Sequence, residues 1–311
     1  MAKRATRESY GLALARYGAD KNIVVLDADL SKSTKTDTFK KAYPERFINM
    51  GIAEGNMMSV AAGIASAGKT VFASSFAMFA AGRAFEQIRN SIGYTNLNVK
   101  IGATHAGISV GEDGGSHQCL EDIALMRSIP NMVVISPSDD IETQTAVKAA
   151  IDYNGPVYLR LGRLAVEDVN GEDYKFELGK GVELRSGNDA AIIATGLTVG
   201  TALEAHKLLT AEGISARVIN IHTIKPLDEE IITKAAKETG AIVTVEEHYI
   251  MGGLGSAVCE AVCKNAPCPV RIIGTEKFGQ SGKPSELLEL YGLTAQNIVR
   301  NVKAAIAMKG E

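Results

Sequence analysis

Short apolar runs that alternate with longer helical stretches constrain the fold of the first half of this chain most strongly. Each run is hydrophobic on both faces, which is typical of a strand buried in a parallel sheet. We expect strands at 23–29, 47–51, 70–75, 97–103, 132–136 and 157–161, with helices at 4–18, 52–67, 78–92, 119–127 and 140–153. This order predicts an α/β fold with a doubly wound, mainly parallel sheet.

The pattern breaks at residues 164–180, an acidic, glycine-containing stretch that we interpret as a linker. Alternation then resumes. We expect strands at 189–195, 216–221, 241–245 and 269–273, with helices at 199–212, 228–238 and 254–265. The sequence therefore predicts two doubly wound, mainly parallel-sheet domains, at residues 1–163 and 181–311.

Charge and hydrophobicity argue against several classes of protein. The net charge of -3 and the pI near 6.0 do not suit a nucleic-acid surface, and no run of Lys and Arg offsets them. No segment has the length and uniform hydrophobicity of a membrane span, and the first residues lack an apolar secretory region. We expect a cytoplasmic protein without nucleic-acid or membrane partners.

Four cysteines occur in a chain that is too large to need disulfides, so we expect reduced thiols. Three of them follow one another closely, at Cys259, Cys263 and Cys268. Small buried cysteines in an Ala/Val helix explain the first two better than metal binding does, and we predict no metal site on this chain.

Glu54 is the one carboxylate in an otherwise uncharged segment, residues 47–68. It falls in the first turn of a predicted helix that is rich in Ala, Met and Val. A favourable interaction with the helix macrodipole would explain it at a gain of about 0.3–1 kcal/mol. A buried carboxylate without a partner is costly, however, and such groups concentrate at functional sites.

Residues 104–118 form a loop that concentrates side chains able to bind a ligand or transfer protons. This loop carries His105, His117 and Asp113 together with several glycines, and it follows a predicted strand. Ligands of parallel α/β sheets gather at the carboxyl ends of strands, and imidazoles transfer protons near neutral pH. The loop therefore favours a site over a merely flexible connection.

Phe76 and Phe79 lie three residues apart, just after the strand at 70–75. Core packing is the default explanation for such a pair. A flat heteroaromatic ligand stacked on one of the rings is the alternative, and spacing alone does not decide between them.

Together these segments resemble the transketolase family of thiamine diphosphate enzymes. Met-Gly-Ile-Ala-Glu-Gly-Asn at 50–56 is similar to the family's glutamate motif, and Phe-Ala-Met-Phe at 76–79 to its aminopyrimidine pocket. Residues 104–118 resemble its His-x5-Gly-Glu-Asp-Gly-x2-His-Gln loop. The resemblance covers the whole chain and implies a pyrimidine-binding domain followed by a transketolase C-terminal domain.

The resemblance also implies roles for individual residues. Glu54 would hydrogen-bond N1′ of the aminopyrimidine, Phe79 would stack on that ring beside Phe76, and His105 and His117 would contact the donor's hydroxyls and relay protons. The substrate site would comprise these residues: Arg7, Ser33, His105, Asp113 and Arg163. Two departures from the family pattern are Gly82, where a pocket tyrosine is common, and Ala106, where an aspartate is common.

The family's diphosphate-binding Gly-Asp-Gly motif does not occur in this sequence. The resemblance therefore implies a split transketolase, in which an N-terminal partner subunit binds the diphosphate through Mg or Ca. Because the family pairs its two cofactor-binding domains across subunits, we expect an α2β2 heterotetramer that contains a dimer of this chain. The expected reaction moves a two-carbon ketol unit between sugar phosphates of the pentose phosphate pathway.

Three alternatives stay open at this point. A 2-oxo acid dehydrogenase E1 β subunit shares the two domains and the glutamate, although the paired histidines suit a sugar phosphate better. A deoxyxylulose-phosphate synthase-like half shares the Asp-Gly-x2-His-Gln core. A non-catalytic assembly paralogue is disfavoured by the presence of Glu54, both histidines and both aromatic rings.

Overall fold

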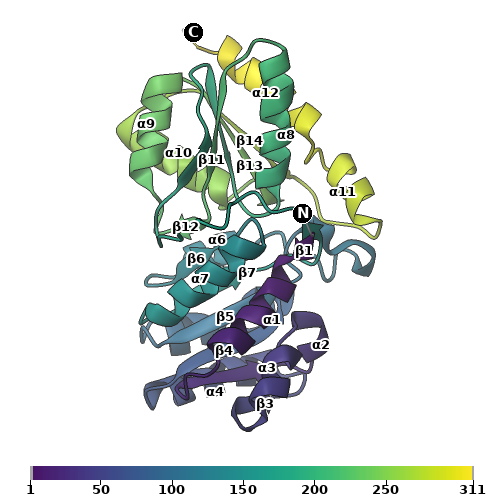
Figure 1. Cartoon of the computed structure of the whole chain (residues 1–311), viewed down its shortest axis with the longest axis vertical. Coiled ribbons are helices and arrows are strands. Elements are labelled where there is room, and N and C mark those ends of the chain that lie inside the picture. The colour runs from purple at the N-terminus through teal and green to yellow at the C-terminus, as the bar shows by residue number, and fades with distance from the viewer. Residues whose placement is uncertain (1–2, 310–311) are drawn as a thin grey trace.

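The computed structural model describes residues 3–309, which form two lobes placed end to end along the long axis (Figure 1). The N-terminal lobe is built on a seven-stranded sheet and the C-terminal lobe on a five-stranded sheet. Both sheets are mainly parallel, and helices cover both of their faces. The predicted α/β fold class is confirmed.

The N-terminal sheet has the strand order β12-β6-β7-β5-β4-β2-β3, in which only β12 is antiparallel to its neighbour. The central strands are buried along their whole length, as their uninterrupted apolar runs require. The bounds are β2 Ile23–Asp27, β3 Phe47–Asn49, β4 Thr70–Phe76, β5 Val99–Thr104, β6 Val133–Ile135, β7 Val157–Arg160 and β12 Thr223–Lys225.

Helices lie on both faces of this sheet and enclose two separate apolar clusters. One face carries α1 (Thr6–Tyr17), α3 (Asp37–Ala42) and α7 (Asp140–Asp152), and the other carries α4 (Glu54–Ser66) and α6 (Asp122–Arg127). Shorter elements are α2 (Ser31–Thr34), α5 (Phe85–Gln87) and the 3-10 turns η1 (Pro44–Arg46) and η4 (Ile108–Asp113).

The C-terminal sheet has the order β14-β13-β10-β11-β9, with β9 antiparallel to β11. Its strands are β9 Val182–Arg185, β10 Ala190–Ala194, β11 Ala216–Asn220, β13 Ile242–Tyr249 and β14 Val270–Thr275. Its helices are α8 Thr198–Ala211, α9 Glu229–Thr239, α10 Leu254–Asn265, α11 Pro284–Leu290 and α12 Ala295–Ala307. A small ribbon pairs β1 (Arg4–Ala5) with β8 (Ala165–Val166).

The two lobes share one apolar cluster. It extends from Met57 and Met126 of the N-terminal lobe to Ile224 and Leu254, and all four side chains are fully buried or nearly so. The short strand β12 joins the N-terminal sheet although it follows three strands of the C-terminal one. The lobes therefore pack on each other through side chains as well as through the backbone of β12.

Several elements differ from the sequence-based expectation. The strands β9 and β12 and the helices α11 and α12 were not expected, because short edge strands and C-terminal helices lack the long apolar runs that mark the central strands. The expected α-helix at 78–92 is mostly π-helical, as η2 (Met78–Arg83) and η3 (Ile88–Gly93) flank α5. π-helical turns are rare and frequent at functional sites.

Every helix within residues 3–309 is too short or too polar to serve as a membrane span.

Candidate functional site

The side chains singled out in the N-terminal lobe meet where β4, β5 and β7 end, at the carboxyl edge of the sheet. Phe76 is the last residue of β4, His105 follows β5 directly, and Arg163 lies three residues beyond β7. Glu54 begins α4, which follows the edge strand β3. The topology thus collects residues from four distant parts of the sequence at one edge.

Glu54 is 1% exposed, and its carboxylate has two partners. Arg83 Nη1 donates to Oε2 at 2.8 Å, and Ser75 Oγ donates to Oε1 at 3.3 Å. The carboxylate is therefore paired within the chain. No pattern in the sequence indicates Arg83 as its partner, because 29 residues separate the two.

Arg83 also lies over the face of Phe79, with its guanidinium carbon 4.6 Å from the ring centroid. One side chain thus contacts both the buried carboxylate and the aromatic face. The wide turns of η2 bring Phe79 and Arg83 to the same side, towards α4. Beside them, a Cβ at Gly82 would lie 2.3 Å from Met78 Cε, so the Met78 side chain fills the space next to Gly82.

The rings of Phe76 and Phe79 are 6.0 Å apart and nearly parallel. Phe76 is stacked on His105 at 3.8 Å, so one of its faces is already covered. Phe79 is half-buried and meets the edge of His117 at 5.3 Å. The two aromatic rings therefore join Glu54 on one side to both site histidines on the other.

His105 is nearly buried and adopts a positive φ of 58°, which is uncommon for a non-glycine residue. Its Nδ1 lies 2.9 Å from Thr104 Oγ1, and its Nε2 lies 2.9 Å from Arg7 Nη1. Because arginine can only donate, Nε2 accepts and the proton is on Nδ1. Burial, reinforced by the charges of Arg7 and Arg163, lowers the pKa of His105 to about 3, so the ring is neutral.

Arg7 and Arg163 approach the same region with like charge. Burial and the charge of Arg163 lower the pKa of Arg7. Arg7 Nη1 donates to the backbone oxygen of Ser33 at 3.1 Å, whereas Arg7 Nε is buried with no hydrogen-bond partner among residues 3–309. Two cations and an unused buried donor make this corner suited to an anion.

Asp113 contacts Arg163 with 3.5 Å between Oδ2 and Nη1, and Arg163 also donates to the backbone oxygen of Val110. His117 is half-buried, and its Nδ1 lies 3.0 Å from Ser116 Oγ. Contacts therefore join seven of the nine candidate residues, with Arg83 as the link to Glu54 and Ser33 contributing its backbone. The other two, Asp113 and Arg163, contact each other, and the charge of Arg163 acts on His105 and Arg7. The guanidinium of Arg160, a residue of β7, points elsewhere, to Asp122 and to the backbone oxygen of Glu247.

The other histidines and the cysteines have different surroundings. His206 lies against the backbone of Ala216 at 2.8 Å, and His222 packs on Phe176. The four cysteines, at 119, 259, 263 and 268, are free. Residues 3–309 contain no cluster of three or more His, Cys, Asp or Glu side chains that could hold a metal ion.

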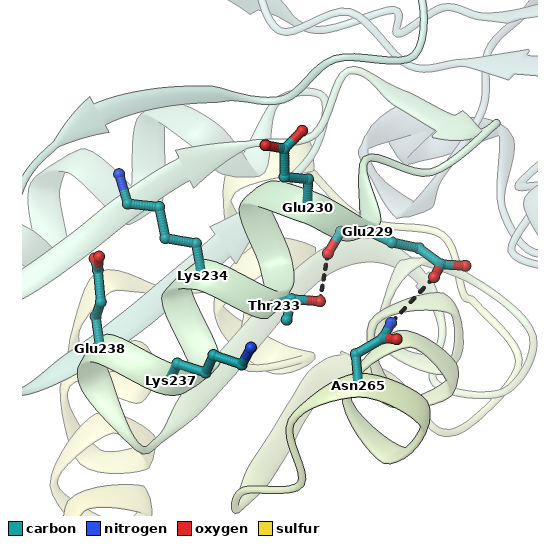
Figure 2. A pocket seen from close by; sticks show the side chains of 7 residues that line it. All are labelled: Glu229, Glu230, Thr233, Lys234, Lys237, Glu238 and Asn265. Atoms are coloured by element: carbon teal, nitrogen blue, oxygen red, sulfur yellow. Dashed lines mark hydrogen bonds between the residues drawn. The ribbon is translucent and has the colours of Figure 1, made fainter.

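A groove on the C-terminal lobe lies beside α9 and is lined by charges of both signs (Figure 2). Glu229 is already paired there, with Lys264 at 3.0 Å and Asn265 at 3.1 Å. The other residues that line the groove project from α9 and carry charges of both signs as well as a hydroxyl group: Glu230, Thr233, Lys234, Lys237 and Glu238. The described residues that line this groove include no aromatic ring, and the N-terminal edge is the better candidate site.

Comparison with known proteins identifies the class. Residues 2–168 match the family Transketolase, pyrimidine binding domain, and residues 179–298 match Transketolase, C-terminal domain. The chain belongs to the transketolase family.

Three relatives show which part of a transketolase this chain is similar to. A Methanocaldococcus jannaschii protein provisionally named as a transketolase C-terminal section is 52% identical over 304 residues, covering 96% of this chain and 95% of that protein. A 6-deoxy-6-sulfo-D-fructose transketolase subunit of a Clostridium species is 42% identical and covers 94% and 92%. A solved split gene transketolase, an inactive β4 tetramer, has 53% identity and a TM-score of 0.92 over 99% of this chain and 100% of that one. The fold is that of the C-terminal subunit of a split transketolase.

Proposed function

We propose that this chain is the C-terminal subunit of a cytoplasmic, thiamine diphosphate-dependent transketolase that moves a two-carbon ketol unit from a ketose phosphate to an aldose phosphate. The observation that carries the proposal is a row of contacts that begins at Glu54 and ends at Arg7. It passes through Arg83, Phe79, Phe76 and His105. Arg163 lies close enough for its charge to lower the pKa of both His105 and Arg7. One end offers a buried carboxylate beside an aromatic face. The other end offers two guanidinium groups, which suit a sugar phosphate.

The Glu54 end fits an aminopyrimidine. Arg83, a flat cation and donor, already bonds the carboxylate and covers Phe79, so a flat ring with a polarised N–H can replace it there. Thiamine diphosphate, when bound, supplies the nucleophilic carbon that takes up the ketol unit. In this assignment Glu54 shares a proton with the ring atom N1′, and Phe79 holds the ring with Phe76 behind it.

The histidine end fits the sugar. His105 is neutral and uses its Nε2 lone pair on Arg7, so a hydroxyl can bind there only by sharing this acceptor or displacing the arginine. We assign His117 to proton relay and Asp113 to the choice of hydroxyl configuration. The substrate phosphate would take Arg7 Nε, Arg163 and the Ser33 region, where the buried donor is unused.

An N-terminal partner subunit completes the site in this proposal. This sequence lacks the family's Gly-Asp-Gly motif, and the relatives above are named as a section, a subunit and a split gene product. The partner would bind the diphosphate with Mg or Ca, and an α2β2 assembly would pair the two chains. Residues 1–163 would be the pyrimidine-binding domain, 164–180 the linker and 181–311 the C-terminal domain.

The purified chain alone should show no ketol transfer, because half of the cofactor site is missing. Adding an N-terminal subunit that carries Gly-Asp-Gly, together with thiamine diphosphate and Mg, should restore it. Ketol transfer from a ketose phosphate is measured by a coupled assay, with a 2-oxo acid as the competing donor.

Robust activity of the chain alone would contradict the split-enzyme proposal. Turnover of the 2-oxo acid in place of the ketose phosphate would favour the dehydrogenase alternative. A stable complex with bound cofactor but no turnover of either donor would favour a non-catalytic role.

Replacing Arg83 by methionine should tighten cofactor binding by about three- to tenfold, because the free chain loses the group that occupies the carboxylate and the ring. The methionine keeps an unbranched apolar stem over Phe79. The dissociation constant of thiamine diphosphate is measured with the assembled complex by calorimetry. Arg89→Met is the matched control, since the Arg89 side chain is exposed and, within residues 3–309, bonds only its neighbour Asn90. Weaker binding in Arg83→Met would mean that Arg83 holds the cofactor and does not compete with it.

A further inference from the structure

Glu247, the sixth residue of β13 in the C-terminal lobe, places its carboxylate against the loop that carries both site histidines. Its side chain is 4% exposed. One carboxylate oxygen accepts a hydrogen bond from the backbone nitrogen of Ser109. Ser109 lies four residues after His105, on the same loop.

The loop is shaped to receive this carboxylate. A Cβ at Gly107 would lie 2.2 Å from Glu247 Cδ, and Gly107 has a φ of +88°. Only glycine combines that conformation with so close an approach. Gly107 separates the strained His105 from Ser109, so the contact with Glu247 restrains the backbone on which the imidazole is mounted.

Two further contacts join the C-terminal lobe to the same loop. Arg160 Nη2 donates to the backbone oxygen of Glu247 at 2.8 Å and lies 3.4 Å from that of Cys119, at the loop's far end. Gln118 Nε2 donates to the backbone oxygen of Gln280 at 3.0 Å. In both of these hydrogen bonds the C-terminal lobe contributes backbone atoms, whereas Glu247 contributes a side-chain acceptor. The apolar side chain of Ile108 also packs in the core cluster of the C-terminal lobe, with Leu287.

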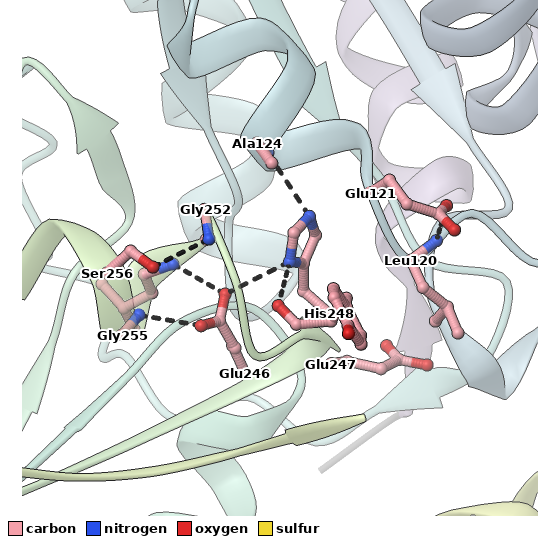
Figure 3. Close-up of polar contacts among 12 residues, drawn as sticks. Leu120, Glu121, Ala124, Glu246, Glu247, His248, Gly252, Gly255 and Ser256 are labelled. Atoms are coloured by element: carbon pink, nitrogen blue, oxygen red, sulfur yellow. Dashed lines mark hydrogen bonds and ion pairs between the residues drawn. The ribbon is translucent and has the colours of Figure 1, made fainter. Parts of the chain in front are cut away.

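Glu246, the acid next to Glu247 in β13, makes different hydrogen bonds. Glu246 accepts from the backbone nitrogens of Leu254 and Gly255 at 2.7 and 2.8 Å, and so caps the start of α10 (Figure 3). Adjacent residues of a strand point to opposite faces, and Figure 3 shows the two carboxylates turned away from each other. Helix capping therefore does not account for Glu247.

We infer that Glu247 is a positioning residue, through which the C-terminal lobe holds the His105–His117 loop in the geometry needed for sugar binding and proton transfer. The catalytic part of this inference rests on the proposed function. The structural part, that Glu247 restrains Ser109, does not.

The carboxyl group is also sensitive to pH. Burial raises the pKa of Glu247 to about 7, against the opposing charge of Arg160, with Asp122 adding to the rise. A solvated glutamate titrates near 4.3, so a closed loop binds the proton more tightly than an open one. Protection of the loop amides against hydrogen exchange should therefore be complete at about pH 4–5 and should decline as the pH rises to about 7.

Amide exchange at Ser109 in the full chain tests the structural part without any need for activity. At pH 5, where the carboxyl group is protonated, Glu247→Ala should raise the exchange rate about 2- to 10-fold, as expected for loss of a neutral hydrogen bond. Glu247→Gln, the isostere of the neutral acid, should keep the protection and remove its decline with pH. Glu260→Ala is the matched control, because it breaks another contact between the lobes, Arg127–Glu260, away from the loop.

With the partner subunit present, Glu247→Ala should lower kcat about tenfold or more while the dissociation constant of the cofactor stays unchanged, since Glu54 and Phe79 lie outside the loop. Unchanged Ser109 exchange in Glu247→Ala would overturn the inference. So would wild-type kcat in that variant despite faster exchange. If the wild-type pair shows no ketol transfer, the proposed function fails while the exchange result still decides the contact.

Should Glu247→Ala fail to fold, Glu247→Asp and Glu247→Gln decide the matter. The aspartate side chain is one methylene too short to reach Ser109. The Ser109 amide should therefore exchange as fast in Glu247→Asp as is expected for Glu247→Ala, and it should stay protected in Glu247→Gln. Equal protection in these two variants would overturn the inference.

Discussion

Glu54→Gln should lower kcat of the assembled transketolase by at least about a hundredfold, the usual contribution of a positioned acid–base group. Glutamine has the same shape and can still bond Ser75, but it cannot exchange a proton with a ring nitrogen. The loss should therefore fall on the chemical step.

The measurement is kcat at saturating thiamine diphosphate, with occupancy of the cofactor checked independently. Glu86→Gln serves as the matched control, because Glu86 is an exposed acid near η2 whose carboxylate, among the described residues, bonds only Gln87 and Asn90. If Glu54→Gln kept more than about a tenth of the wild-type kcat with full occupancy, proton exchange by Glu54 could not be a major part of the catalysis.

The structure changes how the burial of Glu54 is understood. From the sequence, the carboxylate stood without a partner in an apolar segment. In the folded chain it is paired with Arg83, whose side chain is 52% exposed on the other side. The pair stabilises the free chain, and the ligand must replace Arg83 to reach the carboxylate. Glu54→Gln and Arg83→Met should therefore act on different quantities, the rate and the affinity.

The sequence was most informative where local pattern decides structure. The buried strands β2, β4, β5 and β7 follow from continuous apolar runs, and the gathering of site residues follows from the parallel order of these strands. The roles of Arg7 and Ser33 depended on family resemblance, because an arginine in a first helix has no pattern that sets it apart.

Contacts between distant segments were beyond sequence reasoning. The pairing of β12 with β6 depends on how the lobes pack, and no local feature of Thr223–Lys225 indicates it. Glu247 lies two residues beyond the strand predicted at 241–245, and no local pattern sets it apart. Its contact with Ser109 joins residues that are 138 positions apart. Such contacts depend on tertiary packing, which a single sequence does not display.

Asp122→Asn should destabilise the chain by about 3–5 kcal/mol, the range for removing one partner of a buried ion pair. Asp122 is fully buried and Arg160 is 6% exposed. The carboxylate accepts from Arg160 Nε and from Tyr158 Oη, both at 2.9 Å. Burial opposes the charge on Arg160, but Asp122 and Glu247 outweigh it and raise the pKa of the guanidinium. Without the Asp122 carboxylate, the Arg160 guanidinium would stay buried after losing its main negative partner.

Urea unfolding followed by circular dichroism measures this effect, provided that a single transition is observed. Lys148→Met is the control, since the Lys148–Asp152 pair is solvent-exposed and such pairs contribute about 0–1 kcal/mol. The double variant Asp122→Leu/Arg160→Met should recover much of the lost stability, because well-packed apolar residues can replace a buried ion pair. Additive losses in the double variant would show that the two side chains stabilise the junction independently, mainly through their bonds to Tyr158 and to the backbone of β13.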